Sequence, residues 1–84
     1  MLDYYFTFRS ITGAQRGEKT LKKEGIICFL MRAPKYFHMK GCGYALKIPS
    51  GQATAAANVL RMWKIEYGKI YRFDDSGAPQ EVTL

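Results

Sequence analysis

The order of strand-like and helix-like segments is the feature that most constrains how this chain folds. Strand-like segments, with alternating or continuous apolar residues, cover residues 3–9, 26–31, 44–48 and 69–73. Helix-like segments, with apolar residues at helical spacing, lie between Ser10 and Gly25 and between Ser50 and Gly68. The resulting order β-α-β-β-α-β predicts an α+β fold. We expect a ferredoxin-like sandwich with a four-stranded antiparallel sheet and two helices on one face.

Capping residues mark the ends of both helix-like segments. Ser10 or Thr12 can cap the first helix through its side-chain oxygen, and Gly25 suits its C-terminal end. Ser50 is expected to cap the second helix. The apolar face of that helix is expected to contain Ala53, Ala56, Ala57, Leu60 and Trp63.

The length of 84 residues suits one small domain. We expect that domain to cover residues 1–74 and residues 75–84 to form a flexible C-terminal tail, because Ser76, Gly77 and Pro79 favour turns. No apolar run approaches the roughly 18 residues that a membrane-spanning helix needs. The first residues also lack the pattern of a secretory signal. A cytoplasmic location without membrane association is therefore expected.

The net charge of +6 favours acidic partners, which include nucleic acid, an anionic protein surface and an anionic small molecule. A solvated basic surface without a partner is the alternative. Nucleic acid is disfavoured, because Gly43–Ile48 lacks the aromatic pattern found in the third strand of RNA-recognition domains. Residues 13–20 contain two glycines after a strand, but their spacing differs from that of a phosphate-binding P-loop.

A thiol between two glycines is the chemical focus of the sequence. Cys42 is flanked by Gly41 and Gly43, which permit a sharp turn and the close approach of another molecule. The stretch from Gly25 to Ile65 contains no carboxylate. Three lysines in this stretch are expected to favour the thiolate form of the cysteine: Lys35, Lys40 and Lys47. A partly ionised thiol of this kind suits the reversible transfer of a sulfur atom.

Other readings of these residues stay open. His38 lies four residues before Cys42 and could act as its general base, although no residue can be named that would orient the imidazole. Cys42 could instead be a small residue that a tight turn requires. Cys28 lies in an apolar segment and is expected to be a buried small hydrophobe. A disulfide between the two cysteines is disfavoured in an unsecreted chain. A metal site is disfavoured because His38 is the only histidine, and no cofactor fingerprint is present.

Five short patterns are spread over residues 4–73: Tyr4–Phe8, the helical pattern Ala14-x-x-x-Glu18-x-x-Leu21-x-x-x-Gly25, Pro34, Cys42–Gly43 and Ile70–Tyr71. Their combination gives the chain a resemblance to a family of small bacterial domains described as selenium or sulfur carrier-like proteins. The resemblance implies that Cys42 holds a persulfide or selenopersulfide. A donor enzyme would supply the sulfur or selenium, and an acceptor protein would receive it.

Two other classes of protein compete with a carrier. In a small basic binding or regulatory module, the chain would recognise a partner protein, an anionic ligand or RNA, and Cys42 would be structural. An enzyme is the second of these classes. It is less favoured than a carrier or a binding module, because the sequence shows no acid–base pair and no oriented nucleophile. Self-association into a homodimer, through the apolar loop or an unpaired edge strand, is also compatible with the sequence.

Overall fold

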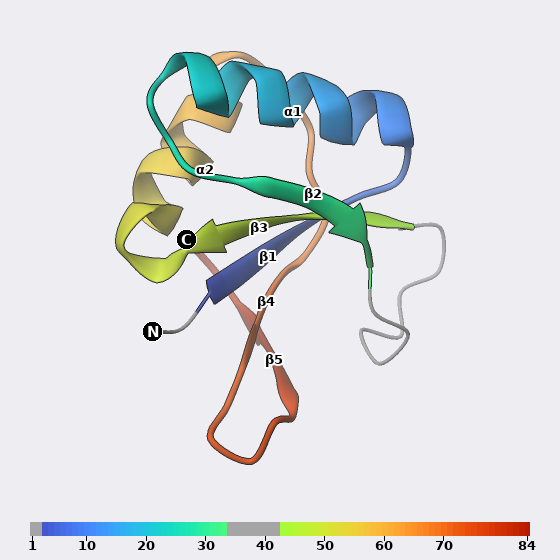
Figure 1. The fold of residues 1–84 in the computed structure, drawn as a ribbon, viewed down its shortest axis with the longest axis vertical. Helices are drawn as coiled ribbons and strands as arrows, with labels where there is room; N and C mark the ends of the chain where they lie inside the picture. Colours follow the sequence, from blue (N-terminus) through green and yellow to red (C-terminus); the bar gives the residue numbers. More distant parts are fainter. Residues whose placement is uncertain (1–2, 34–42) are drawn as a thin grey trace.

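The computed structural model describes residues 3–33 and 43–84. The elements along the chain are β1 (Asp3–Phe8), α1 (Ile11–Lys23), β2 (Phe29–Arg32), β3 (Tyr44–Pro49), the 3-10 turn η2 (Ser50–Gln52), α2 (Ala53–Met62), β4 (Ile70–Phe73) and β5 (Pro79–Val82). The strands form one antiparallel sheet, and both helices cover the same face of it (Figure 1). The α+β class and the antiparallel sheet are therefore as expected.

The sheet has five strands, in the order β2-β3-β1-β4-β5, and the expected number of four was wrong. The additional strand β5 pairs with β4 and lies in the segment expected to be a tail. The turn between them is held by the Asp74 carboxylate, which accepts hydrogen bonds from the backbone N–H groups of Ser76 and Ala78, both at 2.9 Å. Gly77 occupies the left-handed region at φ +84° in the same turn. The ferredoxin-like assignment stays a prediction.

Strand β1 occupies the centre of the sheet, between β3 and β4. Its register places Phe8 opposite Tyr44 of β3 and Tyr5 opposite Tyr71 of β4. The buried hydroxyl of Thr7 donates a hydrogen bond of 2.6 Å to the carbonyl oxygen of Lys69, which joins residues 62 positions apart. The first strand is thus fixed by residues from the second half of the chain.

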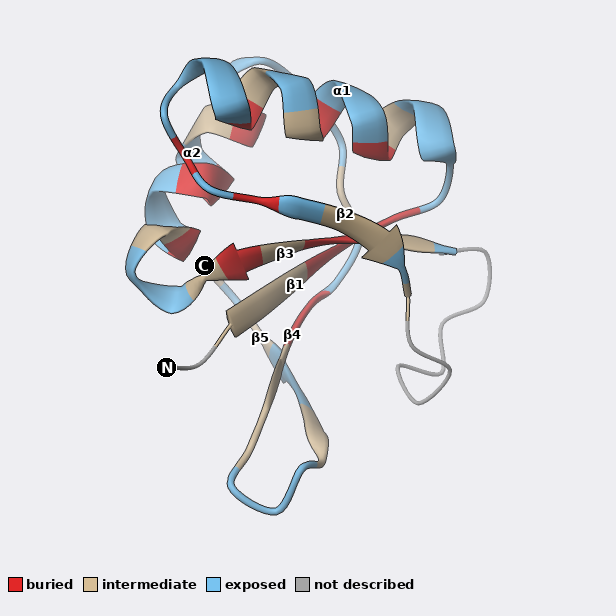
Figure 2. Ribbon diagram, viewed as in Figure 1, coloured by how far each residue is buried: buried red, intermediate tan, exposed pale blue. Residues whose placement is uncertain are grey.

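The hydrophobic core lies between the sheet and the two helices (Figure 2). Helix α1 packs against β1, β2 and β3, and α2 packs against α1 and β3. Gly17 allows the close approach of α1, since a Cβ atom at this position would lie only 3.2 Å from side-chain atoms of both Leu46 and Phe8. The fully buried residues of α2 include Ala56, Ala57 and Leu60, as its apolar spacing predicts.

Helix α1 begins and ends as its sequence predicts. The side chain of Ser10 caps the N-terminus by accepting a hydrogen bond of 3.1 Å from the N–H of Gly13. At the other end, Gly25 adopts φ +76° and the N–H of Ile26 donates to the carbonyl of Leu21 at 2.9 Å. This is the Schellman motif, in which glycine is the usual left-handed residue.

Helix α2 departs from the expectation at both ends. Ser50 makes no side-chain cap, because its backbone lies in the turn η2 that precedes the helix. Trp63 is 56% exposed, so its expected place on the apolar face was wrong. The helix ends at Met62, and the next residues turn away in a second Schellman motif, with Lys64 at φ +56° and the N–H of Ile65 donating to Leu60 at 2.9 Å.

Candidate functional site

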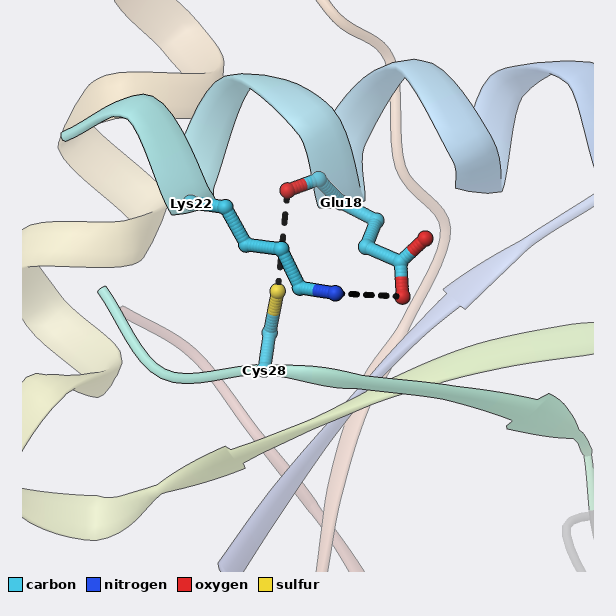
Figure 3. Close-up of polar contacts among 3 residues, drawn as sticks. All are labelled: Glu18, Lys22 and Cys28. Atoms are coloured by element: carbon cyan, nitrogen blue, oxygen red, sulfur yellow. Dashed lines mark hydrogen bonds and ion pairs between the residues drawn. The ribbon is translucent and has the colours of Figure 1, made fainter. Parts of the chain in front are cut away.

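Cys28 lies immediately before β2, under helix α1, and is a free thiol with an exposed fraction of 3%. Figure 3 shows its sulfur pointing to the backbone of α1, where the thiol donates to the carbonyl oxygen of Glu18 at 3.8 Å. The side chain of Glu18 pairs instead with Lys22, at 3.4 Å between Oε2 and Nζ. Cys28 is therefore a shielded part of the core, as its apolar surroundings in the sequence predicted.

The chemistry of the Cys28 thiol is suppressed by this environment. Burial raises the pKa of Cys28, and the nearby Glu18 carboxylate raises it further, whereas Lys22 acts in the opposite direction. The thiolate is the nucleophilic form of cysteine, so a raised pKa keeps Cys28 in its unreactive state at neutral pH. Of the two cysteines, this one is unsuited to exchange sulfur with another molecule.

The loop that contains the second cysteine leaves and re-enters the sheet between β2 and β3. Five of the predicted site residues lie outside the described residues: Lys35, His38, Lys40, Gly41 and Cys42. The base of the loop is described. The N–H of Ala33 donates to the carbonyl of Gly43 at 3.0 Å, and Gly43 itself is exposed.

Arg32 is a cation at the loop base that was not among the predicted site residues. It pairs with Tyr44 in the register of β2 and β3, and its guanidinium carbon lies 5.8 Å from the centre of the Tyr44 ring. Tyr44 follows Gly43 directly, so Arg32 lies across the sheet from the residues next to Cys42. The sequence could have predicted this position, because antiparallel pairing of two strands joined by a loop brings the residues on either side of the loop together.

Lys47 lies within β3 and not at the base of the loop. It is in β3, four residues after Gly43, which corresponds to about 13 Å along an extended strand. Its ammonium group forms an ion pair of 3.6 Å with Asp3 of β1. A Debye length of about 8 Å at physiological salt would screen a charge at that distance. The support of Lys47 for thiolate formation stays a prediction, with Arg32 the nearer of the two cations to the loop base.

The described residues show neither a metal cluster nor a membrane-spanning helix. Among residues 3–33 and 43–84, no group of three or more His, Cys, Asp and Glu side chains is arranged to hold a metal ion. In the same ranges, no helix combines the length and the apolar character needed to cross a bilayer.

The described residues thus form a small α+β fold with a shielded thiol beneath α1. Comparison with protein families defines it further. A family model described as "Putative Se/S carrier protein-like" matches residues 3–72, and the chain belongs to this family. The predicted resemblance is confirmed. No curated protein and no solved structure matches the chain.

Proposed function

We propose that this chain is a sulfur or selenium carrier that holds a persulfide or selenopersulfide on Cys42 and passes it to an acceptor protein. The observation that carries the proposal is the shielding of Cys28, with its raised pKa, in a chain that has two cysteines and belongs to a carrier-like family. Cys42 is then the thiol through which such a family member would act. The cytoplasm, where thiols stay reduced, is the compartment that suits this role.

The proposed transfer is an exchange between sulfur atoms and needs no external oxidant or reductant. The thiolate of Cys42 attacks the terminal sulfur of a persulfide on a donor enzyme such as a cysteine desulfurase. A new S–S bond forms on Cys42, and the donor cysteine leaves as a thiolate. An acceptor thiolate then attacks the terminal sulfur held on Cys42. The terminal sulfur passes to the acceptor, and Cys42 is released as a thiolate. For selenium, a selenium atom takes the place of the terminal sulfur.

Neighbouring residues support these steps in the proposal. Gly41 and Gly43 give the donor and the acceptor access to the thiol, and Lys35 and Lys40 favour the thiolate. Arg32, at the loop base, adds a cation on the β2 side. His38 is a weaker candidate for a general base. The chain itself then needs no further catalytic group, because donor and acceptor supply the other reacting atoms.

The donor and acceptor proteins need a surface beside the loop. Strand β2 leads into the loop and lies at one edge of the described sheet. Ile27 and Phe29, two residues apart along this edge, have exposed fractions of 54% and 61%. Exposed aromatic residues are enriched at protein interfaces. We therefore assign the docking of the partner proteins to this edge.

The test is incubation of the chain with a cysteine desulfurase and cysteine, followed by mass spectrometry of each cysteine peptide. The native protein should gain one sulfur atom on Cys42. Cys42→Ser should abolish the gain and Cys28→Ser should leave it intact. Sulfur confined to Cys28, or no sulfur on either residue, would contradict the proposal and favour a binding module in which Cys42 is structural.

A further inference from the structure

A cleft of about 550 Å³ lies between the N-terminal half of α1 and the segment 64–68, which connects α2 to β4. Phe8 and Tyr67 contribute aromatic surface to its lining. Phe8 has an exposed fraction of 2%. Tyr67 packs edge-on against Phe6, with ring centres 5.2 Å apart. Both aromatic side chains are therefore held in place by the core.

The charged residues around the cleft are mainly basic. Arg9, which precedes α1, and Arg16, in the N-terminal half of α1, line the cleft on one side. Lys64 lines it from the segment 64–68. The one carboxylate in the lining belongs to Glu66, so three cations face one anion. Within the described part of the chain, none of these three cations forms an ion pair, whereas three other lysines do: Lys22, Lys47 and Lys69.

This excess of positive charge favours an anionic ligand. Three cations around one cleft repel one another, and an anionic group between them would convert that repulsion into attraction. Arginine guanidinium groups bind phosphate through two parallel hydrogen bonds, and lysine binds it as a point charge. The pairing of these residue types around one cleft therefore matches a phosphate group.

The backbone of Lys64 gives a second, independent indication. Helices α1 and α2 end in the same Schellman motif, but the left-handed position holds Gly25 in α1 and Lys64 in α2. Glycine is favoured at this position, and a lysine there is strained. Strained residues of this kind cluster where a side chain is needed for binding. In this chain, the strained residue is one of the three cations of the cleft.

We propose that this cleft binds a small phosphate ester, with Arg9, Arg16 and Lys64 around the phosphate and the organic part against Phe8 and Tyr67. The volume lies in the range of small-molecule sites and exceeds what inorganic phosphate alone would need. The proposal goes beyond the carrier function and does not depend on Cys42.

The test uses adenosine monophosphate and ribose 5-phosphate as probes, with adenosine and ribose as their phosphate-free counterparts. Binding is measured by calorimetry and amide chemical shifts, in a low-salt buffer without phosphate. At least one ester should bind at least about tenfold more tightly than its counterpart, as expected for charge-assisted hydrogen bonds. Shifts should centre on residues 9–16 and 64–68.

Variants separate binding from folding. Lys64→Gly removes a cation but relieves backbone strain, so affinity for the ester should fall about tenfold while the folded state becomes more stable. Gly25→Lys is the matched control, because it places lysine in the equivalent motif of α1. It should destabilise the fold and leave ester affinity unchanged. Glu66→Gln should tighten binding, because it removes the one carboxylate of the lining.

Three results would overturn the proposal. The first is equal binding of esters and phosphate-free counterparts, and the second is unchanged ester affinity in the double variant Arg9→Gln, Arg16→Gln. The third is binding of a single-stranded oligouridylate without binding of either small ester, which would assign the basic residues to an RNA backbone. The carrier proposal is tested separately, since Lys64→Gly should still accept sulfur on Cys42 and Cys42→Ser should still bind the ester.

Discussion

Phe8 lies directly opposite Tyr44 in the register of β1 and β3. Phe8 lines the cleft between α1 and the segment 64–68, and Tyr44 begins the strand that follows the Cys42 loop. Both side chains belong to, or pack against, the hydrophobic core. The proposed ester site and the base of the proposed carrier loop thus share one end of the sheet.

The Cys28 thiol should make the stability of the fold depend on pH in the alkaline range. Its pKa is raised in the folded state, so above the ordinary value of about 8.5 the unfolded chain releases a proton that the folded chain retains. Stability from this group is present below that pH and is lost as pH rises toward the folded pKa. Urea unfolding of the native protein and of Cys28→Ala should show a difference in stability that shrinks as the pH rises above about 8.5. A pH-independent difference would contradict the shift.

The same shift predicts slow modification of Cys28 in the native state. The thiolate is the form of cysteine that reacts with iodoacetamide. At pH 7.5, Cys28 should therefore be alkylated far more slowly in the folded chain than in urea. Mass spectrometry of the cysteine peptides provides the measurement. Equal rates in the two states would show that the thiol is accessible.

The two Schellman motifs predict opposite effects of glycine. Gly25→Ala should destabilise the fold by about 1 kcal/mol, because alanine is strained at φ +76°. The loss comes from the backbone and not from a clash, since no neighbouring atom lies within 4 Å of the added Cβ. Lys64→Gly should stabilise the fold by about 1 kcal/mol, because it relieves the same strain in α2. Urea unfolding measures both changes. Gly51→Ala, at a position that also has free space but no positive φ, is the control and should be close to neutral.

Asp74 should stabilise the β4–β5 turn only in its ionised form. A hydrogen bond from the Ser76 hydroxyl and further hydrogen bonds from Ala78, Gln80 and the Ser76 backbone lower the pKa of Asp74 to about 2. Its contribution is therefore present above the unfolded value of about 3.9 and is lost as pH falls toward 2. Asp74→Asn should unfold more readily than the native chain at pH 7, and the two should converge near pH 2. A constant difference would assign the effect to geometry instead of charge.

Phe29 should matter for sulfur transfer and little for folding. Its side chain is 61% exposed, so Phe29→Ala should change stability by less than about 0.5 kcal/mol. If partners dock at the edge strand β2, loading of Cys42 by the desulfurase should slow by roughly tenfold, as for an aromatic interface residue. Met62→Ala, at an exposed position on α2, is the control. Unchanged loading in Phe29→Ala would move the docking surface elsewhere.

Local patterns in the sequence were sufficient for the parts of the fold that local physics determines. The Ser10 cap, the Gly25 stop and the alanine face of α2 each depend on residues within a few positions of one another. Strand β5 was missed because its polar residues have no apolar alternation. The turn before it is held by the Asp74 carboxylate, which accepts hydrogen bonds from the Ala78 N–H and from the side chain of Gln80 in β5.

The candidate sites show the same division. The Cys42 loop could be named from adjacent residues, although most of it lies outside the described part of the chain. The cleft could not be predicted from the sequence, because Arg9, Arg16 and Lys64 come together only when the connection between α2 and β4 folds against α1. In the sequence, Lys64 follows a helix-like segment and is not distinguished from an ordinary surface lysine. Its role emerges only from its backbone angle and its neighbours.

The hydrogen bond from Thr7 to Lys69 also has a consequence for synthesis on the ribosome. Strand β1 is synthesised before both of its neighbours in the sheet, β3 and β4, and the hydrogen-bond partner of Thr7, Lys69, follows 62 residues later. Contacts of such long range form slowly, because a large loop must close before they form. The sheet partners of the aromatic strand β1 are therefore incomplete until β4 has left the exit tunnel. Nascent chains of this protein are for that period the form most exposed to aggregation and to chaperone binding.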